Sequence, residues 1–209
     1  MTYAEFKWFD KVFYAFAKFL AVLLTALIYP LRVQGRENIP KQGPFIVIAN
    51  HISMWEVFFI PRMLFPRRTV FMAKSELFGH GRFYDWVIRV AGGFPVKRGT
   101  ADIGAIKKSL KVLEAGEVFA IFPEGTRNKK LDGTIQKFNN GVGYIALQSG
   151  SPIVPIYFQD STGFKLFRKV RAVVGKPVIF KGFAESGKLN AEMTEKATGM
   201  ALEALSALM

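Results

Sequence analysis

The sequence predicts a single α/β domain with a mixed, largely parallel sheet flanked by helices, preceded by an N-terminal helical motif that binds membranes. Short apolar runs of strand type alternate with longer segments of helical pattern, which is typical of parallel sheets. A length of 209 residues suffices for one domain with a substantial core. We place the N-terminal motif at residues 1–34 and the α/β domain at residues 35–209.

The N-terminal motif contains a long apolar run, Val12–Tyr29, interrupted only by Lys18 and Thr25. As a helix it would span about 27 Å, just short of a hydrocarbon core. One helical face carries Phe6, Phe9, Phe13, Phe16 and Leu20, and the opposite face carries Lys7, Lys11 and Lys18. This pattern favours a pair of amphipathic or shallowly embedded helices that ends at Pro30 and binds anionic lipids. A short transmembrane span and packing against the core are the alternatives, whereas a signal peptide lacks its cleavage pattern.

The remaining chain is divided into strands and helices by its apolar periodicity and its glycines. Expected strands or extended segments are Phe45–Ala49, Thr69–Ala73, Phe94–Val96, Val118–Phe122, Ile153–Phe158, Val170–Val174 and Val178–Phe180. Expected helices are Ser53–Leu64 with an interruption near Pro61, a segment capped by Thr100 that runs to Ala115, Gly141–Gln148, and a last one capped by Asn190 that runs to Leu208.

The amino-acid composition excludes some classes of catalytic site and favours certain partners. The chain has no cysteine, which excludes disulfides and thiolate catalysis, and its two histidines lack metal-ligand spacing, so we expect no metal. The formal net charge of +13 suggests an anionic partner: nucleic acid, a membrane surface, or an acidic protein or phosphorylated substrate. For most individual lysines, a solvated surface position is the simpler interpretation.

His51 and Glu56 are the first candidate catalytic residues. On a regular helix, a spacing of five residues would separate them by about 140°. They can meet only if His51 lies in the turn after the strand and Glu56 in the first turns of the helix. A carboxylate on one imidazole nitrogen then fixes the tautomer, and the other nitrogen can take a proton from a hydroxyl. Ser53 is a weaker candidate, as a nucleophile, because no Gly-x-Ser-x-Gly elbow surrounds it.

Basic turns follow three of the expected strands. Glu124, Gly125, Thr126 and Arg127 come directly after one strand, where glycine lets backbone N–H groups approach an oxyanion and arginine offers a planar fork to phosphate. Arg98 and Lys74 stand near the ends of two other strands. The three cations could converge on one phosphate. The sequence therefore suggests proton abstraction from a hydroxyl of a phosphorylated substrate.

Four segments, taken in order, resemble the motif blocks of the glycerolipid acyltransferase family, which includes 1-acylglycerol-3-phosphate O-acyltransferases. The blocks are Asn50–Glu56, Gly93–Gly99, Phe122–Arg127 and Ile153–Pro155. The resemblance covers roughly residues 35–180. One departure is Glu56, where the family's histidine-x4-aspartate motif has the shorter aspartate. The extra methylene lengthens the reach of the carboxylate by about 1.5 Å.

The resemblance implies transfer of a fatty acyl group from acyl-CoA or acyl carrier protein to the sn-2 hydroxyl of lysophosphatidic acid, giving phosphatidic acid. It implies that His51 is the general base and that Glu56 orients it. The residues that would bind the phosphate are Lys74, Arg98 and Arg127. Glu124, Gly125 and Thr126 would form the third-block loop. It implies no cofactor besides the acyl donor. It also implies a monotopic or peripheral protein of the cell membrane, with its catalytic domain facing the cytoplasm.

Other functions remain open at this point. The acceptor could be glycerol 3-phosphate or another lysophospholipid. A lipid hydrolase that depends on Ser53 and a basic nucleic-acid-binding protein are less favoured. The latter would bind DNA or RNA in a salt-sensitive way, but the chain has no recognisable nucleic-acid motif, so we expect no nucleic-acid partner.

Overall fold

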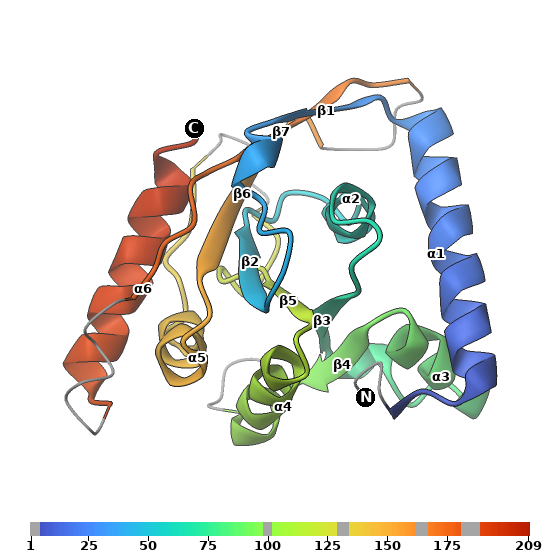
Figure 1. The fold of residues 1–209 in the computed structure, drawn as a ribbon, viewed down its shortest axis with the longest axis horizontal. Coiled ribbons are helices and arrows are strands. Elements are labelled where there is room, and N and C mark those ends of the chain that lie inside the picture. The colour runs from blue at the N-terminus through green and yellow to red at the C-terminus, as the bar shows by residue number, and fades with distance from the viewer. Residues whose placement is uncertain (1–4, 98–101, 129–133, 162–166, 181–188) are drawn as a thin grey trace.

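A computed structural model describes residues 5–97, 102–128, 134–161, 167–180 and 189–209. Its centre is a seven-stranded sheet in the order β1-β7-β6-β2-β5-β3-β4, drawn in Figure 1. Strands β6 and β7 pair antiparallel, and the other neighbouring strands pair parallel. The expected fold class, an α/β domain with a mixed and largely parallel sheet, is confirmed.

The strands are β1 Leu31–Gln34, β2 Phe45–Ala49, β3 Thr69–Lys74, β4 Gly93–Val96, β5 Val118–Ile121, β6 Ile153–Gln159 and β7 Val170–Val174. The α-helices are α1 Trp8–Ile28, α2 Glu56–Met63, α3 Arg82–Val90, α4 Ile103–Glu114, α5 Gly141–Ser149 and α6 Ala191–Ser206. The described residues also contain two short 3-10 helices, Arg36–Asn38 and Ser75–Leu77.

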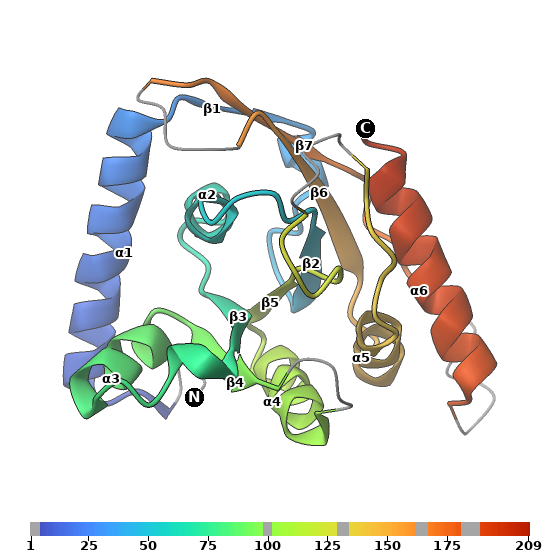
Figure 2. The ribbon, with the colours of Figure 1, turned by 180° about the vertical axis from the view of Figure 1, so that it is seen from behind.

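Helices cover both faces of the sheet. Because successive side chains of a strand point to opposite faces, Phe45 and Val47 of β2 pack on the side of α2, whereas Ile46 and Ile48 pack towards α4, α5 and α6. All five residues of β2 are buried, as a central strand requires. In Figures 1 and 2, α1 stands at one end of the molecule and α6 at the other.

The structure differs from the predicted N-terminal helical motif in several respects. A single helix, α1, replaces the expected pair, because no glycine or proline interrupts the chain between Trp8 and Ile28. The proposed lysine face is also divided: Lys18 is buried, Lys11 is half-buried and Lys7 is exposed. Residues 31–34, assigned to the N-terminal motif from the sequence, form β1 and pair with β7 in the sheet.

Several other boundaries differ from expectation. Strand β1 and helix α3 were not anticipated, and α2 begins at Glu56 and continues through Pro61. Asp102 caps α4, while Thr100, the expected cap, lies outside the described residues. In the last expected extended segment, residues 178–180, the structure has an isolated bridge between Val178 and Ile153 in place of a strand.

The parallel pairing brings the carboxyl ends of β2, β5, β6, β3 and β4 to one edge of the sheet. Ile48 of β2 lies opposite Ile121 of β5 and Pro155 of β6. The segments that leave these three strands therefore start side by side. This edge is where an open α/β sheet places its ligand.

Candidate active site

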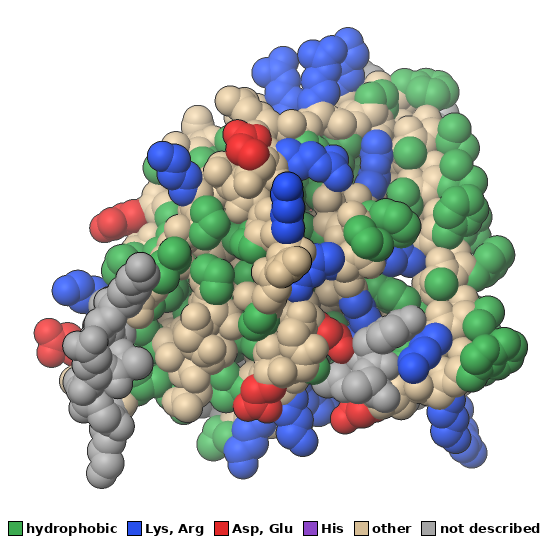
Figure 3. All heavy atoms as spheres, in the orientation of Figure 1, with side chains coloured by type: hydrophobic (Ala, Val, Ile, Leu, Met, Phe, Trp, Pro, Cys, Tyr) green, Lys and Arg blue, Asp and Glu red, His purple; other side chains and the backbone are tan. Residues whose placement is uncertain are grey.

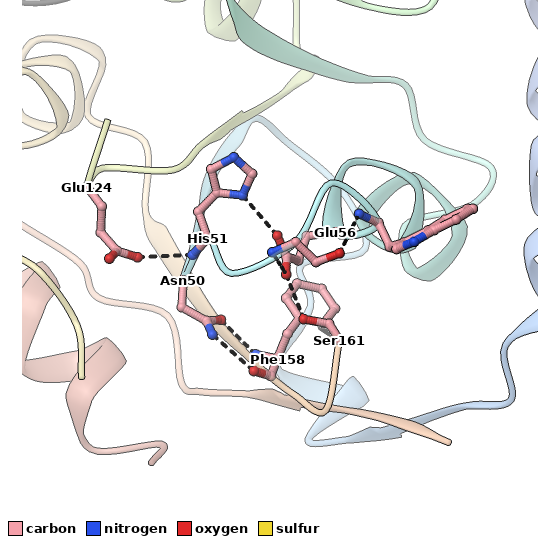
Figure 4. Close-up of polar contacts among 8 residues, drawn as sticks. Asn50, His51, Glu56, Glu124, Phe158 and Ser161 are labelled. Carbon is pink, nitrogen blue, oxygen red and sulfur yellow. Dashed lines mark hydrogen bonds and ion pairs between the residues drawn. The ribbon is translucent and has the colours of Figure 1, made fainter. Parts of the chain in front are cut away.

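The structure brings His51 and Glu56 together at this edge. His51 lies two residues after the end of β2, and Glu56 is the first residue of α2, so the two side chains are not on one helix. Nδ1 of His51 lies 2.9 Å from Oε2 of Glu56 (Figure 4). The glutamate side chain is fully buried, and 12% of the histidine side chain is exposed. The carboxylate accepts a hydrogen bond from the Nδ1–H group, which leaves Nε2 as the basic nitrogen.

The main chain of His51 is held by the third-block loop. Its N–H donates to Oε1 of Glu124 at 3.0 Å, and its carbonyl accepts from the N–H of Asn128 at 2.7 Å. The imidazole also stacks on Phe122, with ring centroids 4.1 Å apart and an interplanar angle of 18°. The histidine is therefore fixed to the segment that follows β5 as well as to its own.

Glu124 is a second buried carboxylate at the site. Its Oε2 accepts a hydrogen bond from the N–H of Gln136 at 3.2 Å, in addition to the bond from His51. Burial raises the pKa of the Glu124 carboxyl, and the two backbone N–H donors act in the opposite direction. Its contacts are those of a residue that shapes the loop. Gly125 in the same turn has a φ of 74°, in the left-handed region that glycine adopts readily.

The cations predicted to bind phosphate fall into three situations. Arg127 is exposed directly after the third-block turn. Lys74 ends β3 at the same edge of the sheet, and its Nζ lies 3.1 Å from Oε1 of Glu76. Arg98 lies outside the described residues, next to Lys97 at the end of the second block. Thr126 is exposed in the turn. The convergence of Lys74, Arg98 and Arg127 on one phosphate stays a prediction.

Ser53 is not arranged as a nucleophile. It is buried, its hydroxyl oxygen accepts a hydrogen bond from the N–H of Trp55 at 3.1 Å, and its own N–H donates to Glu56 at 2.8 Å. Within the described residues, no group of three His, Cys, Asp or Glu side chains could hold a metal ion. The geometry thus offers an imidazole base with a fixed orientation, and Ser53 beside it is not placed as a covalent catalyst.

Three residues of the site were not assigned a role from the sequence. Asn50 makes two hydrogen bonds to the backbone of Phe158, at 2.8 and 3.0 Å, and so ties the end of β2 to β6. Asn128 holds the carbonyl of His51, and Ser161 donates to Glu56 at 2.6 Å. Asn50 and Ser161 share one signal, a polar side chain just after a buried strand, whereas Asn128 lies seven residues beyond β5 and contacts His51 through its main chain. That signal becomes specific only once the order of strands is known.

Comparison with known proteins agrees with this geometry. The model of the family described as Acyltransferase matches residues 30–159. A 1-acyl-sn-glycerol-3-phosphate acyltransferase of Bacillus subtilis is 31% identical over 170 residues, which cover 79% of this chain and 83% of that protein. The chloroplastic enzyme BAT2 of Brassica napus, of the same name, is 28% identical over 81% of this chain, which spans about half (52%) of its length.

A solved structure gives the same result at the level of the fold. The crystal structure of the 1-acyl-sn-glycerophosphate acyltransferase PlsC from Thermotoga maritima superposes with a TM-score of 0.68 at 26% identity, covering 95% of this chain and 81% of the other. The family match contains all four motif blocks and spans more than half of the chain. The resemblance seen in the motif blocks is thereby confirmed, and this chain belongs to the acyltransferase family.

Proposed function

We propose that this protein transfers a fatty acyl group from an acyl thioester to the sn-2 hydroxyl of lysophosphatidic acid, forming phosphatidic acid. The observation that carries the proposal is the buried Glu56 carboxylate on Nδ1 of His51, beside the third-block loop. The names of the Bacillus, Brassica and Thermotoga relatives support lysophosphatidic acid as the acceptor. Acyl-CoA and acyl carrier protein are the two proposed donors, and no further cofactor is needed.

In the proposed reaction, Nε2 of His51 takes the proton of the sn-2 hydroxyl while the oxygen attacks the thioester carbonyl carbon. The tetrahedral intermediate collapses with cleavage of the carbon–sulfur bond, and the departing thiolate takes the proton back from His51. Glu56 stabilises the imidazolium between these steps. Arg127, Arg98 and Lys74 would bind the acceptor's phosphate, for which Lys74 would exchange its partner Glu76.

The experiment that tests this function uses the purified protein in detergent with lysophosphatidic acid and a panel of acyl-CoA and acyl-carrier-protein donors. We expect phosphatidic acid as the product with at least one donor class, and loss of product with His51→Ala. Glycerol 3-phosphate and a lysophospholipid without a terminal phosphate monoester serve as competing acceptors. Faster acylation of either competitor, or release of free fatty acid as the main product, would contradict the proposal.

We also propose that α1 lies in the membrane interface. Its outward face consists of large apolar residues, all 40–77% exposed: Trp8, Phe9, Val12, Phe16, Phe19, Leu20, Leu23, Leu24 and Leu27. At 100° per residue, they fall within an arc of about 160°. Hydrophobic side chains follow the outer side of α1 at the right of Figure 3. An apolar stripe of this size on the outside of a protein is typical of a membrane-binding surface.

The polar side of α1 faces the protein, which supports a monotopic rather than a spanning position. Lys18 donates to the carbonyls of Pro66 and Arg67, Arg62 donates to the carbonyls of Thr25 and Tyr29, and Asp10 accepts from the indole of Trp86 at 2.7 Å. The helix is long and apolar enough to cross a bilayer. However, these contacts hold the helix against the catalytic domain near its start, middle and end. The helix could cross the bilayer only if these contacts broke or the catalytic domain entered the membrane with it.

Helix α3 extends the same surface. Phe83 is 73% exposed, and its ring contacts Trp86, which in turn stacks on Phe9 of α1 with centroids 5.8 Å apart. Aromatic side chains are favoured at the level of the lipid head groups. With a net charge of +13, the protein would bind an anionic leaflet, and the catalytic domain would face the cytoplasm, where acyl thioesters are available.

A further inference from the structure

We propose that Ser161 is a positioning residue for catalysis, which aims the Glu56 carboxylate at His51. Ser161 follows β6, lies 105 residues from Glu56 in the sequence, and is 2% exposed. Its hydroxyl donates to Oε1 of Glu56 at 2.6 Å (Figure 4). The kinetic consequence rests on the proposed function, whereas the geometric one can be tested without substrate.

The two oxygens of Glu56 have separate tasks. Oε1 accepts from the hydroxyl of Ser161 and from the N–H of Ser53 at 2.8 Å, and Oε2 meets Nδ1 of His51 at 2.9 Å. Because the two donors on Oε1 come from different segments, they fix the plane of the carboxylate. Oε2 is then directed to the imidazole.

Ser161 and Ser53 are not equivalent in this role. Ser53 belongs to the same turn as His51 and Glu56 and would move with it. Ser161 leaves β6, the neighbour of β2 in the sheet. The end of β6 is held to Asn50 by the two hydrogen bonds at Phe158. Ser161 therefore fixes the carboxylate relative to the sheet and not only relative to its own loop.

The longer side chain of Glu56 gives this contact its importance. Glutamate has one more rotatable bond than the aspartate of the family motif, and a fully buried carboxylate needs donors on both oxygens. With Ser161 present, the glutamate spans from the sheet to His51. An aspartate at position 56 would be about 1.5 Å shorter and could not reach both partners from the same backbone.

The first test is the kinetics of Ser161→Ala. We expect kcat to fall about 10- to 100-fold, the range for a lost hydrogen bond to a charged group, with KM for lysophosphatidic acid changed less than about twofold. Ser161→Cys keeps the side chain close in size but donates weakly, so it should fold and lose activity in the same direction. Ser109→Ala is the matched control, because Ser109 is also fully buried and donates to a backbone carbonyl in α4.

A double-mutant cycle isolates the coupling. In a Glu56→Asp background, removing the Ser161 hydroxyl should cost less than about twofold in kcat, because the shorter carboxylate has already lost one partner. Independent effects would multiply instead. Wild-type kcat in Ser161→Cys, or multiplying effects of Glu56→Asp and Ser161→Ala, would overturn the proposal.

The second test needs no substrate, so it stands even if the proposed reaction is wrong. The chain has two histidines, and His80→Gln leaves His51 as the sole source of imidazole signals. We expect a downfield Nδ1 proton resonance for His51 that shifts upfield or broadens in Ser161→Ala and is unchanged in Ser109→Ala. An unchanged resonance in Ser161→Ala would show that Ser161 does not position Glu56.

Discussion

At the scale of single residues, the site depends on where chain segments end. The His51–Glu56 pair could be predicted because both partners lie in one local segment, and a strand end followed by a helix start is the arrangement that lets them meet. The contacts of Asn128 and Ser161 could not be predicted. They depend on β5 and β6 flanking β2, which the sequence does not state.

Glu56→Gln should be far more damaging than its shape suggests. The amide oxygen can replace Oε1 towards Ser53 and Ser161, which turns the NH2 group towards Nδ1 of His51. His51 would then carry its proton on Nε2, the nitrogen that has to accept one. We expect kcat to fall on the order of 10²- to 10⁴-fold. Steady-state kinetics checks this, with unchanged circular dichroism as the control for folding; a loss below about tenfold would contradict it.

At the scale of elements, buried strands were predicted well because their apolar runs are continuous and short. Helix starts were less accurate, since Thr100 and Asp102 are both reasonable caps by residue type and only the structure distinguishes them. Strand β1 was missed because Leu31–Gln34 alternates exposed and half-buried residues next to a strongly apolar helix. The prediction of two N-terminal helices was wrong, because an aromatic stripe shows which face of a helix is apolar but not where a helix is interrupted.

Asp102 joins the stability of α4 to the second motif block. Its Oδ1 caps the helix at the N–H of Ala105, and its Oδ2 accepts from the N–H of Lys97, both at 3.0 Å. Asp102→Ala should cost about 1 kcal/mol of unfolding free energy and raise KM for lysophosphatidic acid. The matched control is Asn190→Ala, which removes the cap of α6 at Met193 far from the site. Similar destabilisation with unchanged KM is expected there; an equal rise of KM in both variants would contradict the link.

Lys18 gives the protein a pH-dependent stability. Burial, followed by the charge of Arg68, lowers the pKa of Lys18 from 10.5 to about 8. Between these two values the unfolded chain keeps the proton and the folded chain has lost it, so stability rises with pH in this window. Relative to Lys18→Met, the wild type should gain about 3 kcal/mol between pH 8 and 10.5. Urea unfolding of both proteins in detergent measures this difference, and a constant difference would contradict it.

At the scale of the whole molecule, the apolar face of α1, the aromatic residues of α3 and the excess of basic residues describe a protein with one side towards a membrane. The composition indicates an anionic partner but does not distinguish a membrane from nucleic acid or an acidic protein. The reversed polarity of α1, with Lys18 and Thr25 buried and its leucines exposed, supplies the distinction that composition lacks.

Removing part of this apolar face should weaken membrane binding. We expect Phe16→Asn with Leu23→Asn to lower partitioning onto phosphatidylglycerol vesicles by about 100-fold or more, since each large apolar side chain contributes about 1.5–3 kcal/mol when buried. Flotation of the purified protein with vesicles checks this. Ile103→Asn is the control, because Ile103 is 64% exposed on α4. An equal loss of vesicle binding in the α1 double variant and in Ile103→Asn would contradict membrane binding through α1.

The proposed reaction depends most on the base that His51 provides, and the other histidine of the chain is a natural control. His80 is exposed and contacts the carbonyl of Glu76. The decisive measurement is phosphatidic acid formation from lysophosphatidic acid by wild type, His51→Ala and His80→Ala under saturating donor. We predict a loss on the order of 10²- to 10⁴-fold for His51→Ala and wild-type activity for His80→Ala. Wild-type turnover by a folded His51→Ala protein would contradict the mechanism.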